Sequence, residues 1–142
     1  MKSITIEVPG PPVAQARTRS TKTGHHYTPK RSADYRNLIA LAARQVWKEA
    51  PLECLCKIDV AVSTLAPKTM PAKMRKAFNV CGFLPSGKRP DCDNYLKQAC
   101  DAMNGIVVKD DSQFWKATCR KYISETPEII ITISYEEQHD NR

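Results

Sequence analysis

The chain has 142 residues, a length typical of one domain that can bury a modest core. Its 42% hydrophobic and 26% charged residues are ordinary for a soluble globular protein, and no run of about 18 apolar residues predicts a membrane span. The first residues lack the apolar segment of a signal peptide, so we expect a cytoplasmic protein. The net charge of +7 favours a polyanionic partner.

The first half of the chain predicts two strands separated by a helix. Residues 3–8 alternate apolar and polar side chains, and the prolines that follow end this strand. Residues 13–30 have no periodic pattern and are expected to be irregular, basic and mobile. Ser32 is a candidate N-cap for a helix over about 33–49, and residues 55–65 alternate again as a strand. The predicted buried stripe of the helix consists of Tyr35, Leu38, Ile39, Ala42, Ala43 and Val46.

The second half predicts two further helices and two further strands. Met70-Pro71 can open a short helix that runs through Phe78, within an otherwise irregular tract. Asp93 can cap a helix that runs to about Met103, where Asn104-Gly105 is a typical stop. Residues 113–122 and 128–136 are the remaining predicted strands.

Together these elements predict an α+β fold, with a small mixed sheet of about four strands packed by two main helices. We expect a single domain over residues 1–142, with a flexible tail from about 137 to 142. The six cysteines are expected to be reduced thiols, because no export signal precedes them. Cys54 and Cys56 leave a zinc site open, but no matching Cys or His pair follows them, and buried apolar thiols are the alternative.

Asp91 and Asp93 are the first candidates for chemistry. Hard cations such as Mg²⁺ and Mn²⁺ prefer oxygen ligands, and phosphodiester cleavage needs an activated water and neutralised charge at phosphorus. In an extended segment, positions i and i+2 point to one side, so both carboxylates can reach one ion. The following helix also presents its N-terminal end to the site, which favours anions such as phosphate.

Lys97 and the Asp110-Asp111 pair complete this candidate site. Lys97 lies about one helical turn after Asp93, so it either contacts a phosphate oxygen or forms a surface pair with Asp93. Asp110 and Asp111 lie at a predicted turn, where acidic residues are also common for reasons of turn geometry alone. Because adjacent strand residues point to opposite faces, only one of the two is expected to contact a metal directly.

Basic residues gather in two tracts, 15–36 and 68–89, and the second directly precedes the candidate carboxylates. A positive surface beside a negative site suits an enzyme that acts on a phosphate backbone. Trp115 could stack on a base or pack in the core, and His25-His26 could contact phosphate or be solvated. The candidate DNA-binding residues are Arg17, Arg19, Lys30, Arg31, Lys73, Arg75, Lys76, Lys88 and Arg89.

Three motifs in the same order resemble the RusA family of Holliday-junction resolvases. They are Lys88-Arg89-Pro90-Asp91-Cys92-Asp93-Asn94-Tyr95-Leu96-Lys97, then Asp101-Ala102-Met103-Asn104-Gly105-Ile106-Val107, then Asp110-Asp111-Ser112-Gln113. The opening Val8-Pro9-Gly10-Pro11-Pro12, the basic segment after it and Tyr27-Thr28-Pro29-Lys30 extend the resemblance over nearly the whole chain. Two features depart from the family pattern: Tyr95 stands where leucine is usual, and the tract 67–87 is longer than in the shortest members.

The resemblance implies a homodimer with two active sites, each holding Mg²⁺ or Mn²⁺ on aspartates. It places the metal ligands at Asp91, Asp93 and Asp111, with Asp110 as a less critical neighbour, and the essential lysine at Lys97. The implied activity is symmetrical nicking of four-way DNA junctions during recombination or repair, by proteins often encoded in phages and prophages. Two alternatives stay open, a dimer that binds branched DNA without cutting it and a nuclease that acts on flaps or structured RNA.

Overall fold

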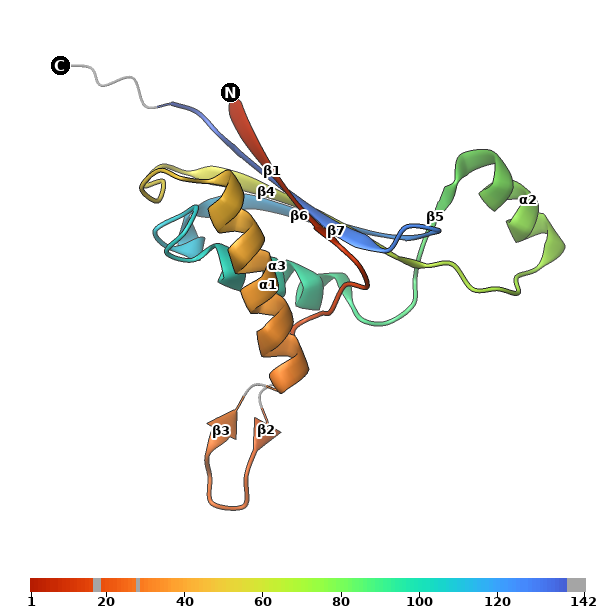
Figure 1. Ribbon diagram of the computed structural model, residues 1–142, viewed down its shortest axis with the longest axis horizontal. Coiled ribbons are helices and arrows are strands. Elements are labelled where there is room, and N and C mark those ends of the chain that lie inside the picture. Colours follow the sequence, from red (N-terminus) through yellow and green to blue (C-terminus); the bar gives the residue numbers. More distant parts are fainter. Residues whose placement is uncertain (17–18, 28, 138–142) are drawn as a thin grey trace.

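Five strands form one mixed sheet: β1 Lys2–Pro9, β4 Cys56–Leu65, β5 Phe83–Pro85, β6 Phe114–Ser124 and β7 Glu128–Tyr135 (Figure 1). The computed structural model describes residues 1–16, 19–27 and 29–137. The strand order is β1-β7-β4-β6-β5. The β4–β6 pair is parallel, and the other neighbours are antiparallel.

One face of this sheet carries the hydrophobic core. The helices α1 (Lys30–Val46) and α3 (Cys92–Met103) pack on that face and share its core cluster. Alternate strand residues point to the same face, as the two-residue period of a strand requires. Core side chains from the sheet include Ile4, Ile6, Val8, Ile58, Val60, Val62, Ile129, Ile131 and Ile133.

The start of α1 differs from its sequence-based prediction. The helix begins at Lys30 with Pro29 at the N-cap position, so the prediction that Ser32 caps the helix was wrong. Ser32 lies in the first turn and is only 2% exposed. Its hydroxyl accepts a hydrogen bond from the Ala16 N–H at 3.2 Å, which ties the irregular segment before the helix to α1.

The predicted apolar stripe of α1 is only half buried. Tyr35, Ile39 and Ala43 are buried, whereas Leu38 and Val46 are 46% and 48% exposed. Periodicity identifies a helical face, but the width of that face is decided by which elements cover it. In this chain, the sheet and α3 together cover a narrower strip of the α1 surface than the predicted apolar stripe.

The helix α3 ends as predicted but begins one residue before Asp93. Asp91 occupies the N-cap position in extended backbone, so the prediction that Asp93 caps the helix was wrong. Asn104 is the C-cap, and Gly105 follows with φ +76°, a left-handed conformation that favours glycine. A short 3₁₀ helix, η1 (Asp111–Gln113), then leads into β6.

Two smaller elements project from the sheet and its helices (Figure 1). One is the helix α2 (Ala72–Cys81), which ends three residues later than the sequence predicts. The strand β5, which follows α2 and pairs with β6 at the edge of the sheet, was not predicted. The other is a hairpin of β2 (Arg19–Ser20) and β3 (His26–Tyr27), so residues 13–30 are not irregular throughout. Both projections belong to the two basic tracts of the sequence.

The predicted α+β class is therefore confirmed, with five strands in the main sheet instead of about four and a third helix, α2. All six cysteines are free thiols, and Cys56 is fully buried. In the described part of the chain, none of the helices has the length and apolar character needed to cross a bilayer.

Candidate functional site

The N-terminal end of α3 carries two exposed carboxylates. Asp91 makes no capping hydrogen bond with its side chain, while its backbone carbonyl accepts from the Asn94 N–H at 3.2 Å. Asp93 stands in the first helical turn, and its Oδ1 accepts from the same Asn94 N–H at 3.0 Å. The two residues are thus not parts of one extended segment, as the sequence argument assumed. What brings them together is the end of the helix, whose dipole stabilises negative charge there.

Lys97 follows one turn later on α3 and is exposed. None of the ion pairs among the described residues joins it to Asp93. Its ammonium group is therefore not engaged with that carboxylate, which leaves it available to a phosphate oxygen.

Asp110 and Asp111 lie in a tightly held turn at the other end of α3. Asp110 caps η1: its carboxylate accepts from the Ser112 N–H at 3.0 Å, and the Gln113 side chain accepts from the Asp110 N–H at 2.9 Å. The Asp111 N–H donates to the Asn104 side chain at 2.7 Å, which docks the turn on the C-cap of α3.

Gln113 fixes this turn from the opposite side. Its Nε2 donates to the Leu52 carbonyl at 2.7 Å and to the Cys54 carbonyl at 2.8 Å. One side chain therefore connects the Asp110 backbone to the loop before β4. Sequence reasoning did not single out Gln113, although it lies within the last family motif.

The two carboxyls of the turn shift each other's proton affinity. The pKa of Asp110 is lowered, chiefly because the Ser112 N–H donates to its carboxylate, and also by its hydrogen bond with Asp111. The pKa of Asp111 is raised by partial burial, by that hydrogen bond and by the negative charges of Asp110 and Asp101, although Asn104 opposes the rise. Accumulated negative charge of this kind is relieved by a cation.

The two aspartate pairs lie toward opposite ends of α3. Asp91 precedes the first residue of this 12-residue helix, while the Asp111 backbone is bonded to Asn104 just after its last residue. A helix of that length spans about 18 Å. Across residues 1–16, 19–27 and 29–137, no three His, Cys, Asp or Glu side chains gather closely enough to hold a metal ion. The oxygen donors suit Mg²⁺ or Mn²⁺, but each end of α3 contributes only a pair.

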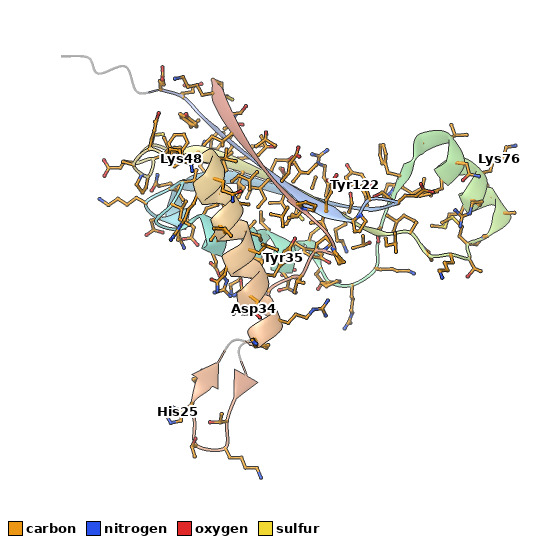
Figure 2. All side chains as sticks on the ribbon, in the orientation of Figure 1. His25, Asp34, Tyr35, Lys48, Lys76 and Tyr122 are labelled. Atoms are coloured by element: carbon orange, nitrogen blue, oxygen red, sulfur yellow. The ribbon has the colours of Figure 1, made fainter. Side chains whose placement is uncertain are left out.

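The candidate DNA-binding residues fall into three groups. The first lies around the hairpin and the start of α1, where Lys30 and Arg31 are exposed; Arg17 and the Arg19 side chain lie outside the described residues. The second is on α2, where Lys73 and Lys76 are exposed. Figure 2 shows His25 on the hairpin and Lys76 on α2, on the two separate projections.

Arg75 differs from its neighbours on α2. Its Nη2 donates to the Lys68 carbonyl at 3.1 Å and to the Pro67 carbonyl at 3.4 Å, and its guanidinium lies 5.7 Å from the centre of the Phe78 ring. These contacts hold the loop before α2, so part of its role is structural. The third group, Lys88 and Arg89, is exposed and is separated from Asp91 by Pro90 alone.

A buried polar cluster, which the sequence did not indicate, connects α3 to neighbouring segments. Gln98 is 0% exposed, and its Nε2 donates to the Ser32 carbonyl at 2.8 Å and to the Val13 carbonyl at 3.3 Å. Its Oε1 accepts from Arg36 Nε at 3.3 Å. This single side chain connects α3 to α1 and to the segment after β1. No local sequence signal distinguishes Gln98 from an exposed polar residue of the helix.

Phe114 and Trp115 follow the acidic turn, and they differ in burial, as expected for adjacent residues of a strand. Phe114 packs against the core, whereas Trp115 is 59% exposed, with the Lys57 ammonium 5.1 Å from its ring centre. His25 and His26 are exposed on the hairpin, and the tail beyond residue 137 lies outside the described residues.

Two comparisons place this architecture among known proteins. A family model described as Endodeoxyribonuclease RusA matches residues 9–134, a range that contains both aspartate pairs, Lys97 and Gln113. The uncharacterized protein YqaN of Bacillus subtilis (strain 168) is 35% identical over 137 residues, which cover 94% of this chain and 96% of that protein.

Proposed function

Because the chain belongs to the RusA endodeoxyribonuclease family, we propose that it is a metal-dependent endonuclease that resolves four-way DNA junctions in the cytoplasm, during recombination or repair. The observation that carries the proposal is the exposed aspartate pair at the N-terminus of α3, with the exposed Lys88 and Arg89 just before Pro90 and Asp91. Carboxylates that can hold a hard cation then lie beside cations that can hold a phosphate backbone.

The proposed roles follow from the position of each side chain. Asp91, Asp93 and Asp111 would hold Mg²⁺ or Mn²⁺, with Asp110 next to them. When bound, such an ion supplies an activated water and neutralises charge at the scissile phosphate. Lys97 would stabilise negative charge on the phosphate or on the leaving oxygen. The helix N-terminus favours the same anion.

The separation of the aspartate pairs favours a homodimer with shared sites. About 12 Å of helix lies between Asp93 and Asp101, the residue whose charge acts on Asp111, whereas metal–oxygen bonds are about 2 to 2.6 Å long. If two chains pack with their α3 helices antiparallel, the Asp91 end of one helix meets the Asp111 end of the other. Two-fold symmetry then produces two equivalent sites, which matches the two strands that a junction presents for cutting.

A mixing experiment tests this arrangement. The variants Asp91→Asn and Asp111→Asn are each expected to be inactive on a labelled junction with Mg²⁺. After the two are unfolded and refolded together, half of the dimers are mixed, and each mixed dimer has one intact shared site. About a quarter of the wild-type nicking should return, as single nicks without resolution. If both aspartates serve a site within one chain, the mixture stays inactive and the shared-site proposal fails.

A substrate panel tests the activity itself. The wild-type protein is incubated with a four-way junction, a linear duplex and a flap, with and without Mg²⁺. Metal-dependent cutting of the junction in preference to the others is expected. Tight binding without cutting of any substrate would favour the binding-only alternative, and faster cutting of the flap would favour a nuclease for other branched DNA.

A further inference from the structure

Two neighbouring hollows lie beside the start of α3, outside the aspartate pairs. The larger has a volume of about 680 Å³ and lies between residues 12–16 and the first turns of α1 and α3. The smaller, about 20 Å³, lies toward β4 and β6. Thr64, Arg89 and Tyr95 line both, and we call the two together the Tyr95 hollow. Pro90, the residue before Asp91, also lines it, so the hollow adjoins the candidate metal ligands.

The lining of the Tyr95 hollow is strongly positive. Among the described residues, its lining includes no carboxylate and four cations, which are Arg31, Lys88, Arg89 and Lys121. None of the ion pairs among the described residues involves any of the four. Lys121 Nζ donates to the Lys88 carbonyl at 2.8 Å and to the Pro90 carbonyl at 3.1 Å, which holds the 88–90 segment against β6. The positive charge gathered there has no counter-ion within the described protein.

Polar groups converge on the same place. Tyr95 is 2% exposed as a whole residue, but its hydroxyl is not among the fully buried polar atoms, and none of the hydrogen bonds among the described residues involves it. Arg31 lines the same hollow as Tyr95. Asn94, in the first turn of α3, adds an amide, whereas the Thr64 hydroxyl already donates to the Tyr122 carbonyl at 3.4 Å. A hydroxyl donor without a protein partner, in a hollow that is also lined by cations outside any ion pair, suits an anion.

On the basis of the proposed nuclease function, we propose that the Tyr95 hollow binds a phosphate group of the DNA strand, adjacent to the phosphate that is cut beside Asp91. Arginine side chains can each direct two N–H groups at phosphate oxygens, and the Tyr95 hydroxyl can donate to a third. The positive end of α3 favours the same charge. A phosphate held there fixes the register of the strand, so the next phosphodiester is presented to the carboxylates.

Binding of a fluorescent four-way junction, measured without divalent metal so that no strand is cut, tests the proposal. The test variants are Arg89→Gln and Tyr95→Phe. Their matched controls are Arg44→Gln, the same charge loss at the far end of α1, and Tyr35→Phe, a buried hydroxyl outside the hollow. Arg89→Gln should weaken binding about tenfold and reduce the slope of log K against log salt by about 0.9. Tyr95→Phe should weaken binding severalfold at an unchanged thermal midpoint, and both controls should bind like wild type.

Each result decides the question. If Arg89→Gln and Arg44→Gln bind with equal affinity and equal salt slope, only the overall charge of the protein matters. If Tyr95→Phe binds as tightly as Tyr35→Phe, the Tyr95 hydroxyl is not part of the site. Inorganic phosphate is the second probe: it should compete with the junction for wild type but not for Arg89→Gln. If phosphate raises the thermal midpoint without competing, the hollow takes a free anion and the strand assignment is overturned. Junction cutting with Mg²⁺ is measured in parallel. If the wild type binds the junction through the Tyr95 hollow but does not cut it, the proposed nuclease function is refuted and the phosphate site in the hollow is not.

Discussion

Replacing Gln113 by methionine would remove the clamp on the acidic turn while nearly preserving side-chain volume. The substitution removes three hydrogen bonds, to the Asp110 N–H, the Leu52 carbonyl and the Cys54 carbonyl. A neutral hydrogen bond contributes about 1 kcal/mol of net stability. The Leu52 carbonyl keeps a second donor, the Lys109 N–H at 3.1 Å, and the exposed Asp110 can bond to water. The expected loss of unfolding free energy is therefore about 2 kcal/mol rather than 3.

Urea denaturation measures this loss directly. With a denaturant slope of about 2 kcal/mol per molar urea, the midpoint should fall by about 1 M. Gln45→Met is the matched control, because Gln45 is exposed on α1, and it should change the unfolding free energy by less than about 0.5 kcal/mol.

The same variant tests the role of the turn in the proposed nuclease. Groups that orient metal ligands typically change metal affinity about 10- to 100-fold when they are lost. The Mg²⁺ concentration for half-maximal junction cutting should rise by at least about tenfold in Gln113→Met, measured well below its unfolding midpoint. A midpoint shift no larger than that of Gln45→Met would refute the structural reasoning. A destabilised variant with unchanged Mg²⁺ dependence would refute the connection between this turn and the metal.

Two further substitutions probe the charges and the buried polar cluster. Because the pKa of Asp111 is raised on folding, chiefly by partial burial and by the Asp110 carboxyl, its ionised form destabilises the fold. That penalty is absent below about pH 4, grows as the pH rises through the raised pKa and is complete above it. Asp111→Asn should therefore be more resistant to urea than the wild type only toward neutral pH. Gln98→Met should cost about 3 to 5 kcal/mol in the same assay, because it leaves Arg36 Nε and the Ser32 carbonyl without a side-chain partner; a loss below about 1 kcal/mol would contradict this account of the cluster.

Periodicity in the sequence was sufficient to identify the main elements. The alternation in 3–8 and 55–65 corresponds to β1 and β4, and the runs 113–122 and 128–136 correspond to β6 and β7. The Asn104-Gly105 stop marks the end of α3 because a left-handed residue there is a local requirement. These features depend on neighbours in the chain, so local residue patterns determine them.

Features that depend on distant neighbours were not predictable in this way. Ser32 is buried rather than capping because the segment after β1 folds over it, and Leu38 is exposed because nothing in the described chain covers that side of α1. The hairpin and β5 are too short for a periodic signal. Gln98 looks like any polar helix residue until three segments meet around it.

The candidate site shows the same division. Residue types and spacing singled out Asp91, Asp93, Lys97 and the Asp110-Asp111 pair as candidates for metal and phosphate chemistry, the family resemblance selected Asp111 from that pair, and the family match spans all of these positions. The sequence could not determine that the first and the last aspartates lie toward opposite ends of α3, because spacing along a chain does not specify where a distant segment docks. Only the tertiary structure decided this separation, through the hydrogen bond of Asn104 to the Asp111 backbone and the Gln113 clamp.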